Sequence, residues 1–281
     1  MVNKTSILVI SSQVVSGQVG LKAMLPGFRL IGFETITLQT TLLAAHPVAF
    51  PDMGPPVGRT VPAEEMLETF DWLLKAGALD QVGAIISGYL PTPSHVDAAA
   101  KMVTTLKAKN QDLIYCCDPI CGDHDHLYLP AQVAQGLAEQ LLPLADLATP
   151  NCFELQYLTQ SGPLTTSQEV VHAARSLQIP HIAVTSSPAP EGRIATLAVG
   201  TETARCETAK APHAPHGMGD LFSALYLGLR LIGDAKALGI ATGTLAHIAN
   251  RNMQTQTLPH GPLTLAAPAL QETLVVSNKP S

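Results

Sequence analysis

Two acidic residues of this 281-residue chain lie at or shortly after the ends of apolar stretches, where a carboxylate can serve as a base or a metal ligand. Asp118 ends the stretch DLIYCC and precedes Pro119, which has no backbone N–H to donate to a sheet. Glu154 follows the stretch ADLATPN, at the start of an expected helix. Both also have ordinary interpretations, as a turn aspartate and as a solvated acid in the first turn of a helix. Taken alone, the residues leave these alternatives open.

The segment PHGMGD, residues 215–220, combines two glycines with an aspartate and runs directly into the stretch LFSALYLGLRL. Gly217 and Gly219 allow the backbone to wrap closely around a ligand, and the helix that follows adds its positive end. Such a turn can hold an anion. Because an acid here would repel a phosphate, Asp220 is better explained as a base that accepts a proton from an attacking hydroxyl. The alternative is a plain interaction of Asp220 with the helix dipole.

The stretch YCCDPICGDHDHLYL contains three of the five cysteines and two histidines, which raises the question of a metal site. Side chains alternate between the faces of a strand, so Cys116 and Cys117 should point in opposite directions. The spacing of Cys121, His124 and His126 matches no usual zinc pattern. We therefore expect the cysteines to pack as small hydrophobic residues, and we do not expect zinc.

The composition excludes several classes of protein. Hydrophobic residues make up 46% and charged residues 14%, which is enough apolar material for a sizeable core. The net charge is −6 and there is no basic stripe, so we expect no nucleic-acid partner. The short apolar runs predict no membrane span and no signal peptide, which favours a cytoplasmic protein. The motifs GxxxxGK[ST] and GxGxxG are missing, so neither a P-loop nor a Rossmann dinucleotide site is expected.

Short apolar runs alternate with amphipathic stretches along the chain. This alternation predicts a mostly parallel sheet with helices on both faces, and such folds bind ligands at the carboxyl ends of their strands. Strands are expected at residues 6–10, 33–40, 83–88, 112–119, 145–151 and 181–187, with a hairpin at 193–199 and 202–208. Helices are expected near residues 18–31 and at 63–77, 94–109, from 152 onward, 219–233 and 235–253.

The motifs, in this order, resemble the ribokinase-like superfamily in its vitamin-kinase branch, and above all the pyridoxal kinase family. The resemblance covers nearly the whole chain and rests on ILVISSQVVSGQVG, LQTTLLAAH, IISGYL, CDPICGD, LYLP, TPNCFEL, VTSS and GMGDLFSA. Any one motif is weak, but several in order at expected strand ends are a strong signal. The resemblance implies a ribokinase-like three-layer αβα sandwich with a mostly parallel central sheet and a small edge hairpin, as a single domain over residues 1–281.

The resemblance also implies transfer of the ATP γ-phosphoryl group to the 5′-hydroxymethyl group of pyridoxal, pyridoxine or pyridoxamine. Asp220 would be the base, and the backbone of Gly217, Met218 and Gly219 would form the anion hole. Asp118 and Glu154 would help to hold Mg²⁺, partly through water. The residues implied in ATP binding are Asn151, Glu154, Thr185 and Ser186, with Asp123 and Tyr128 in a lid. Those facing the vitamer are Ser12, Val19, Thr40, His46 and Tyr89. The family also implies K⁺ and a homodimer.

The first loop departs from the family pattern. Ser16 replaces the usual aromatic residue of V-V-Y-G, and Gln13 and Gln18 replace a flanking pair of histidines. We therefore expect part of the contact with the vitamer ring to be lost or moved. In the lid, Leu127 stands where some relatives carry a reactive cysteine, so no covalent trapping is expected there.

Two rival functions remain at this point. Hydroxymethylpyrimidine kinases share the fold but typically carry Cys in the sequence G-T-G-C, where this chain has Asp220. A catalytically silent vitamer-binding or pyridoxal-phosphate carrier would not need Asp118, Glu154 and Asp220 together. His124 and His126 are interpreted as solvated lid residues, with a phosphate contact as the alternative.

Overall fold

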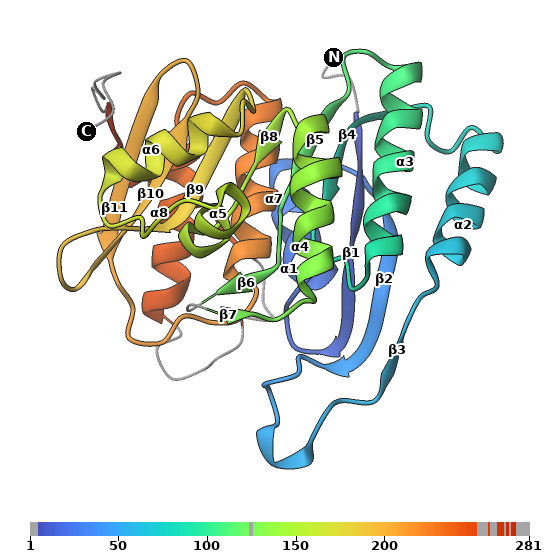
Figure 1. Ribbon diagram of the computed structural model, residues 1–281, viewed down its shortest axis with the longest axis horizontal. Helices are drawn as coiled ribbons and strands as arrows, with labels where there is room; N and C mark the ends of the chain where they lie inside the picture. Colours follow the sequence, from blue (N-terminus) through green and yellow to red (C-terminus); the bar gives the residue numbers. More distant parts are fainter. Residues whose placement is uncertain are drawn as a thin grey trace.

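The computed structural model describes residues 5–123, 126–251, 258, 263–266, 268–269 and 271–273, which form three layers around one sheet (Figure 1). The sheet has ten strands in the order β12-β11-β10-β9-β8-β5-β4-β1-β2-β3. Its central strands run parallel, and antiparallel strands extend both edges. The parallel strands are β1 (Ser6–Ser16), β2 (Thr35–Ala45), β4 (Val82–Ser87), β5 (Ile114–Cys117), β8 (Leu147–Ala148) and β9 (His181–Ser187). The antiparallel ones are β3 (Gly58–Thr60), β10 (Arg193–Val199), β11 (Thr203–Ala209) and β12 (Gln271–Thr273).

Helices cover both faces of the sheet (Figure 1). One face carries α2 (Ala63–Lys75), α3 (Pro93–Lys109), α4 (Ala131–Gly136), α5 (Cys152–Thr159) and α6 (Ser167–Ser176). The other face carries α1 (Leu21–Ile31), α7 (Met218–Leu231) and α8 (Ala237–Arg251). Short elements complete the chain: η1 (Pro51–Met53), the hairpin β6 (Gly122–Asp123) and β7 (His126–Leu127), η2 (Leu137–Leu141) and η3 (Leu142–Leu144). The predicted three-layer fold, including the hairpin of β10 and β11, is confirmed.

The core consists of two clusters, one on each face of the sheet. Leu8 and Ile10 of β1 belong to one cluster, and Ile7 and Val9 belong to the other. Because both faces are covered, the central strands need apolar residues at every position, which explains their short continuous apolar runs. No described helix is long and apolar enough to cross a membrane.

The cysteines of β5 pack as expected. Cys117 lies in the cluster beneath α3 and α4, whereas Cys116 lies in the opposite cluster beneath α7. Cys121 is also fully buried. Burial raises the pKa of Cys117 to about 12, so its thiol stays protonated and unreactive. The described residues contain no group of three or more side chains placed to hold a metal ion; His124 lies outside them.

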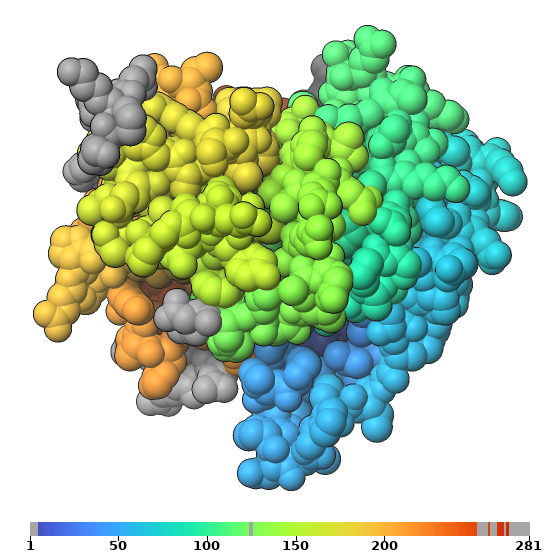
Figure 2. Space-filling view, viewed as in Figure 1, coloured from blue at the N-terminus to red at the C-terminus, as the bar shows by residue number. Residues whose placement is uncertain are grey.

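The first two strands are longer than the apolar pattern predicts. Parallel pairing of β1 with β2 continues beyond the core as far as Ser16 opposite Ala45, with an irregularity between Ser11 and Gln13. The segment that follows β2, through η1 to β3, projects from the body of the molecule and is blue in Figure 2. The first helix begins at Leu21 rather than near residue 18, because the loop of residues 17–20 turns toward α7.

Candidate active site

The carboxyl ends of the parallel strands bring the predicted acids together at one edge of the sheet. Asp118, Glu154 and Asp220 are all buried, with exposed fractions of 4%, 3% and 9%. Burial, followed by the negative charges of Glu154 and Asp220, raises the pKa of Asp118 well above its usual value, and hydrogen bonding from Ser223 and Thr149 opposes that shift. The repulsion of Asp118 by two other buried acids is unfavourable in the ligand-free protein, which is typical of a functional site.

Asp220 lies in the first turn of α7 and has one oxygen free to react. Its Oδ2 accepts a hydrogen bond of 2.9 Å from the backbone N–H of Gly20, in the first loop. Its Oδ1 is buried and has no hydrogen-bond partner among the described residues. Burial raises the pKa of Asp220 to about 6, although the Gly20 N–H acts in the opposite direction. A carboxylate with a near-neutral pKa and a free oxygen is suited to general-base catalysis.

The turn before α7 approaches the first loop so closely that only glycine fits. Gly217 has φ +85°, and a Cβ atom there would lie 2.0 Å from the carbonyl oxygen of Gln18. Gly219 faces open space, with no atom within 4 Å of a Cβ in its place. No side chain of the described residues caps the N-terminus of α7. The backbone N–H groups of Gly217, Met218 and Gly219 are therefore positioned for an anionic ligand.

Glu154 joins the start of α5 to the segment after β5. Its Oε2 accepts from the backbone N–H of Asn151 at 2.9 Å, and its Oε1 accepts from that of Cys121 at 3.0 Å. The Asn151 side chain completes a capping box and donates to the carbonyl of Gly122 at 2.9 Å. Burial nevertheless raises the pKa of Glu154 to about 8. Glu154 thus supports the base of the predicted lid, which contains Asp123.

The acids suit magnesium held largely through water. Carboxylate oxygens are preferred Mg²⁺ ligands, and a divalent cation would relieve the repulsion that raises the pKa of Asp118. Both oxygens of Glu154 already accept backbone N–H groups, so a direct bond from Glu154 to a metal would compete with them. A hydrated ion that retains several waters fits this arrangement, as Mg²⁺ usually does beside phosphates.

On the predicted vitamer side, the structure brings the middle of β1 and of β2 together with the segment that follows β4. The Thr40 hydroxyl donates to the carbonyl of Tyr89 at 2.8 Å, and the N–H of Tyr89 donates to Ser11 Oγ at 3.2 Å. A Cβ atom at Gly20 would lie 2.3 Å from the carbonyl oxygen of Ser12, so the first loop folds tightly over this point. Val19 is buried in the same loop.

A stacked pair of histidines connects the predicted vitamer side with the anion loop, which is the turn of residues 217–219 where α7 begins. The rings of His46 and His216 lie 4.7 Å apart at an interplanar angle of 23°. His46 Nδ1 is buried without a partner among the described residues, and burial, then the charge of His216, lower the pKa of His46 to about 4. Sequence reasoning assigned no role to His216; its place directly before Gly217 was the available signal.

On the predicted nucleotide side, Thr185 and Asn151 form a bridge between the ends of β9 and β8. Ser186 has φ +52°, a conformation that is uncommon for residues other than glycine and that often marks functional sites. Tyr128 is 51% exposed and follows the hairpin of β6 and β7. The structure therefore places Asn151, Thr185 and Ser186 at neighbouring strand ends and leaves Tyr128 at the surface.

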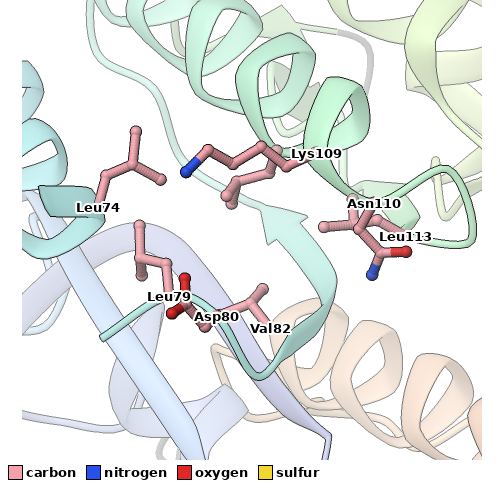
Figure 3. A pocket seen from close by; sticks show the side chains of 8 residues that line it. Leu74, Leu79, Asp80, Val82, Lys109, Asn110 and Leu113 are labelled. Carbon is pink, nitrogen blue, oxygen red and sulfur yellow. The ribbon is translucent and has the colours of Figure 1, made fainter. Parts of the chain in front are cut away.

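A cavity of about 230 Å³ lies at the opposite edge of the sheet (Figure 3). It is lined mainly by apolar side chains of α2, α3 and the segments before β4 and β5, with Asp80, Lys109 and Asn110 as polar members. It contains none of the predicted site residues and lies at the amino ends of the strands. The carboxyl edge, where ligands bind in parallel α/β sheets, is therefore the better candidate site.

Comparisons with known proteins agree with this geometry. The pyridoxine/pyridoxal/pyridoxamine kinase of Bordetella pertussis is 34% identical over 267 residues, covering 92% of this chain and 92% of that protein. A pyridoxal kinase of Leifsonia xyli is 31% identical over 227 residues, covering 78% of this chain and 79% of that protein. This chain belongs to the pyridoxal kinase family. The family predicted from the motifs is confirmed.

The wider family and the solved structures support the same assignment. The family model described as phosphomethylpyrimidine kinase matches residues 61–234 of this pyridoxal kinase family member. The crystal structure of pyridoxal kinase from Entamoeba histolytica is 25% identical, with a TM-score of 0.83 and coverage of 91% and 92% of the two chains. A pyridoxal kinase from Leishmania donovani in complex with ADP and pyridoxamine, 23% identical, has the same fold at a TM-score of 0.87, with coverage of 96% and 100%.

Proposed function

We propose that this protein transfers the γ-phosphoryl group of ATP to the 5′-hydroxymethyl group of a B6 vitamer, namely pyridoxal, pyridoxine or pyridoxamine. The observation that carries the proposal is the buried carboxylate of Asp220 beside the anion loop. Its Oδ2 accepts from the N–H of Gly20, and its Oδ1 has no hydrogen-bond partner among the described residues. Relatives named as pyridoxal kinases, and a related structure that holds ADP with pyridoxamine, agree with it.

The reaction follows from the roles of these groups. Asp220 Oδ1 accepts the proton of the vitamer hydroxyl while the hydroxyl oxygen attacks the γ-phosphorus, and the bond from that phosphorus to the ADP oxygen breaks. The N–H of Gly20 holds Oδ2 and so orients the carboxylate. The backbone N–H groups of Gly217, Met218 and Gly219 stabilise the negative charge on the transferring group.

The remaining predicted residues have supporting roles. Asp118, and Glu154 through water, would hold Mg²⁺, which supplies charge neutralisation at the phosphates. K⁺ is also proposed from the family, without an assigned residue. Asn151, Glu154, Thr185 and Ser186 contact the nucleotide, and Asp123 and Tyr128 belong to a lid that closes over it. The vitamer lies against Ser12, Val19, Thr40, His46 and Tyr89.

We also propose a single catalytic domain that acts in the cytoplasm as a homodimer. One continuous sheet through the described residues supports the single domain. The projecting segment between β2 and β3 supports the dimer, because Phe50, Met53 and Val57 are 50%, 82% and 80% exposed. Large apolar side chains that cluster on a surface commonly mark protein interfaces. Sedimentation of the purified chain would test the dimer.

Release of ADP tests the proposed activity. The chain should release ADP from ATP with Mg²⁺ and K⁺ when pyridoxal, pyridoxine or pyridoxamine is added at millimolar concentration. Hydroxymethylpyrimidine is the comparison substrate, because of the matching family model. Turnover of hydroxymethylpyrimidine alone would favour that kinase instead. Vitamer binding without any turnover would favour a carrier, and both results contradict the proposal.

A further inference from the structure

A buried chain of hydroxyl groups connects Asp118 to two other elements of the site. Ser223 Oγ, on α7, donates to Asp118 Oδ2 at 2.9 Å. Thr149 Oγ1, just after β8, lies 2.8 Å from Ser223 Oγ. Ser223 is 1% exposed and Thr149 is 4% exposed, so bulk water does not reach these contacts. The chain therefore links the ends of β5 and β8 to the helix that carries Asp220.

The number of hydroxyl protons limits which group can donate in each of these hydrogen bonds. An ionised carboxylate can only accept, so Ser223 directs its single hydroxyl proton to Asp118. The hydroxyl of Thr149 hydrogen-bonds both Ser223 and Asp118, so its proton is directed to the oxygen of Ser223 or to the carboxylate itself.

Ser223 has a second acceptor within reach, and this acceptor belongs to the anion loop. Its Oγ lies 3.0 Å from the carbonyl oxygen of Gly219, the i−4 position where a helical serine commonly bonds to its own backbone. One proton cannot serve the carbonyl of Gly219 and Asp118 equally. A serine with a purely structural role would donate its proton to the carbonyl of Gly219. Donation to Asp118 instead connects the helix that follows the anion loop with this carboxylate.

We propose that Ser223, supported by Thr149, is a positioning residue that fixes Asp118 Oδ2 and so orients this carboxylate toward the hydrated metal ion. This inference rests on the proposed function, because the role of Asp118 toward magnesium is part of it. The residues that orient metal-facing carboxylates matter nearly as much as the carboxylates, and their loss typically costs about 10- to 100-fold in metal affinity.

Metal binding measured separately from nucleotide binding tests the inference. The probe is Mn²⁺, followed by electron paramagnetic resonance in the presence of saturating ADP; ADP alone, in EDTA, is measured by calorimetry. Ser223→Ala should weaken Mn²⁺ binding about 10- to 100-fold, with ADP affinity in EDTA within about twofold of wild type. The Mg²⁺ concentration for half-maximal rate should rise in parallel, while KM for the vitamer should stay unchanged.

Three further variants separate positioning from packing. Ser223→Thr retains the hydroxyl and should preserve Mn²⁺ binding. Thr149→Val removes a hydroxyl that bonds both Ser223 and Asp118. It should act in the same direction as Ser223→Ala, with less than additive loss in the double variant, because the two hydroxyls share these contacts. Ser176→Ala is the matched control, because the Ser176 hydroxyl donates to Ala173 of its own helix, α6, at 2.7 Å; it should bind Mn²⁺ as wild type does.

The outcomes distinguish this inference from the proposed function. The positioning role would be overturned if Ser223→Ala bound Mn²⁺ with wild-type affinity. It would also be overturned if the variant lost affinity for ADP in EDTA and for Mn²⁺ by the same factor. If Ser223→Ala does not fold, wild-type Mn²⁺ affinity in Thr149→Val would overturn it in the same way. A wild-type protein that neither binds Mn²⁺ with ADP nor phosphorylates a vitamer would instead refute the proposed function itself.

Discussion

Asp118 and Asp146 belong to neighbouring strands of the sheet but lie at opposite ends of them, Asp118 at the carboxyl ends and Asp146 at the amino ends. Their surroundings are opposite in charge. Asp146, just before β8 at the amino edge, accepts from Lys107 Nζ at 2.7 Å and from the backbone N–H of Tyr115 at 2.7 Å. Asp118, just after β5 at the carboxyl edge, has the hydroxyl of Ser223 as a donor. Its nearest charges are those of two other acids, which raise its pKa further.

This difference separates a structural acid from a functional one. A carboxylate paired with lysine and a backbone N–H stabilises the folded chain without any ligand. A buried carboxylate beside like charges destabilises it, and such groups persist where ligands or substrates offset the cost. The carboxylate at the amino ends of the strands is thus neutralised by groups of the protein itself. The carboxylates at the carboxyl ends need a bound ligand to offset their repulsion.

The largest expected effect comes from removing the base at the carboxyl edge. Asp220→Asn keeps the size of the side chain but cannot accept the hydroxyl proton, so kcat should fall about 10²- to 10⁴-fold. The anion loop binds phosphate through backbone N–H groups, which the substitution leaves in place, so the Kd for ATP should stay the same or decrease. The control is Asp146→Asn, with kcat within about threefold of wild type. An Asp220→Asn enzyme that also retained kcat within threefold would show that Asp220 is not the base.

The pH dependence gives the next largest effect. The pKa of Asp220 is raised from 3.8 to about 6, so the base is protonated and inactive below that pH. We expect kcat/KM for the vitamer to fall about tenfold per pH unit below pH 6 and to level off above it. Asp146→Asn should retain this profile. A rate independent of pH between 5 and 7 would contradict the assignment.

Stability should change in opposite directions at the two edges. The raised pKa of Asp118 means that its stabilising contribution is present below its unfolded pKa and is lost as pH rises through the folded value. Asp118→Asn should therefore raise the free energy of unfolding of the ligand-free protein at pH 9, by about 0.5–2 kcal/mol, the usual size of a stabilising substitution. Asp146→Asn should lower it by roughly 1 kcal/mol, because its ion pair is partly exposed.

Urea unfolding at pH 5 and pH 9 measures both effects. The gain from Asp118→Asn should be larger at pH 9, where the wild-type carboxyl is more ionised. The same sign for both variants at pH 9 would remove the proposed distinction between the two acids.

The smallest expected effect concerns the histidine stack. His216→Val removes the ring that stacks on His46, and an aromatic pair contributes about 0.5–1.5 kcal/mol, so KM for the vitamer should rise about 2- to 12-fold. KM for ATP should stay unchanged. His216→Phe should retain most of the affinity, and Trp72→Ala, which removes an exposed aromatic ring on α2, is the control. Equal changes in both KM values would indicate a general disturbance of the loop.

The fold, and the end of the strands that carries the chemistry, can both be predicted from the sequence. The runs at residues 6–10 and 83–88 are apolar at nearly every position because strands covered on both faces must be, and this pattern predicts the parallel sheet. A local motif likewise predicted the glycine turn before Asp220, because its residues are near one another in the chain. The capping box of Asn151 and Glu154 is equally local but was not predicted; Glu154 was interpreted either as a ligand-binding residue or as a solvated first-turn acid.

Which of these strand ends touch one another depends on how the whole chain folds. The bond from Gly20 to Asp220 joins residues 200 apart, and that from Ser223 to Asp118 joins residues 105 apart. The stack of His46 on His216 likewise depends on the extended pairing of β1 with β2. Such contacts depend on the order of strands in the sheet and on the path of the first loop, which arise from packing of the whole chain and leave no periodic or local pattern in the sequence.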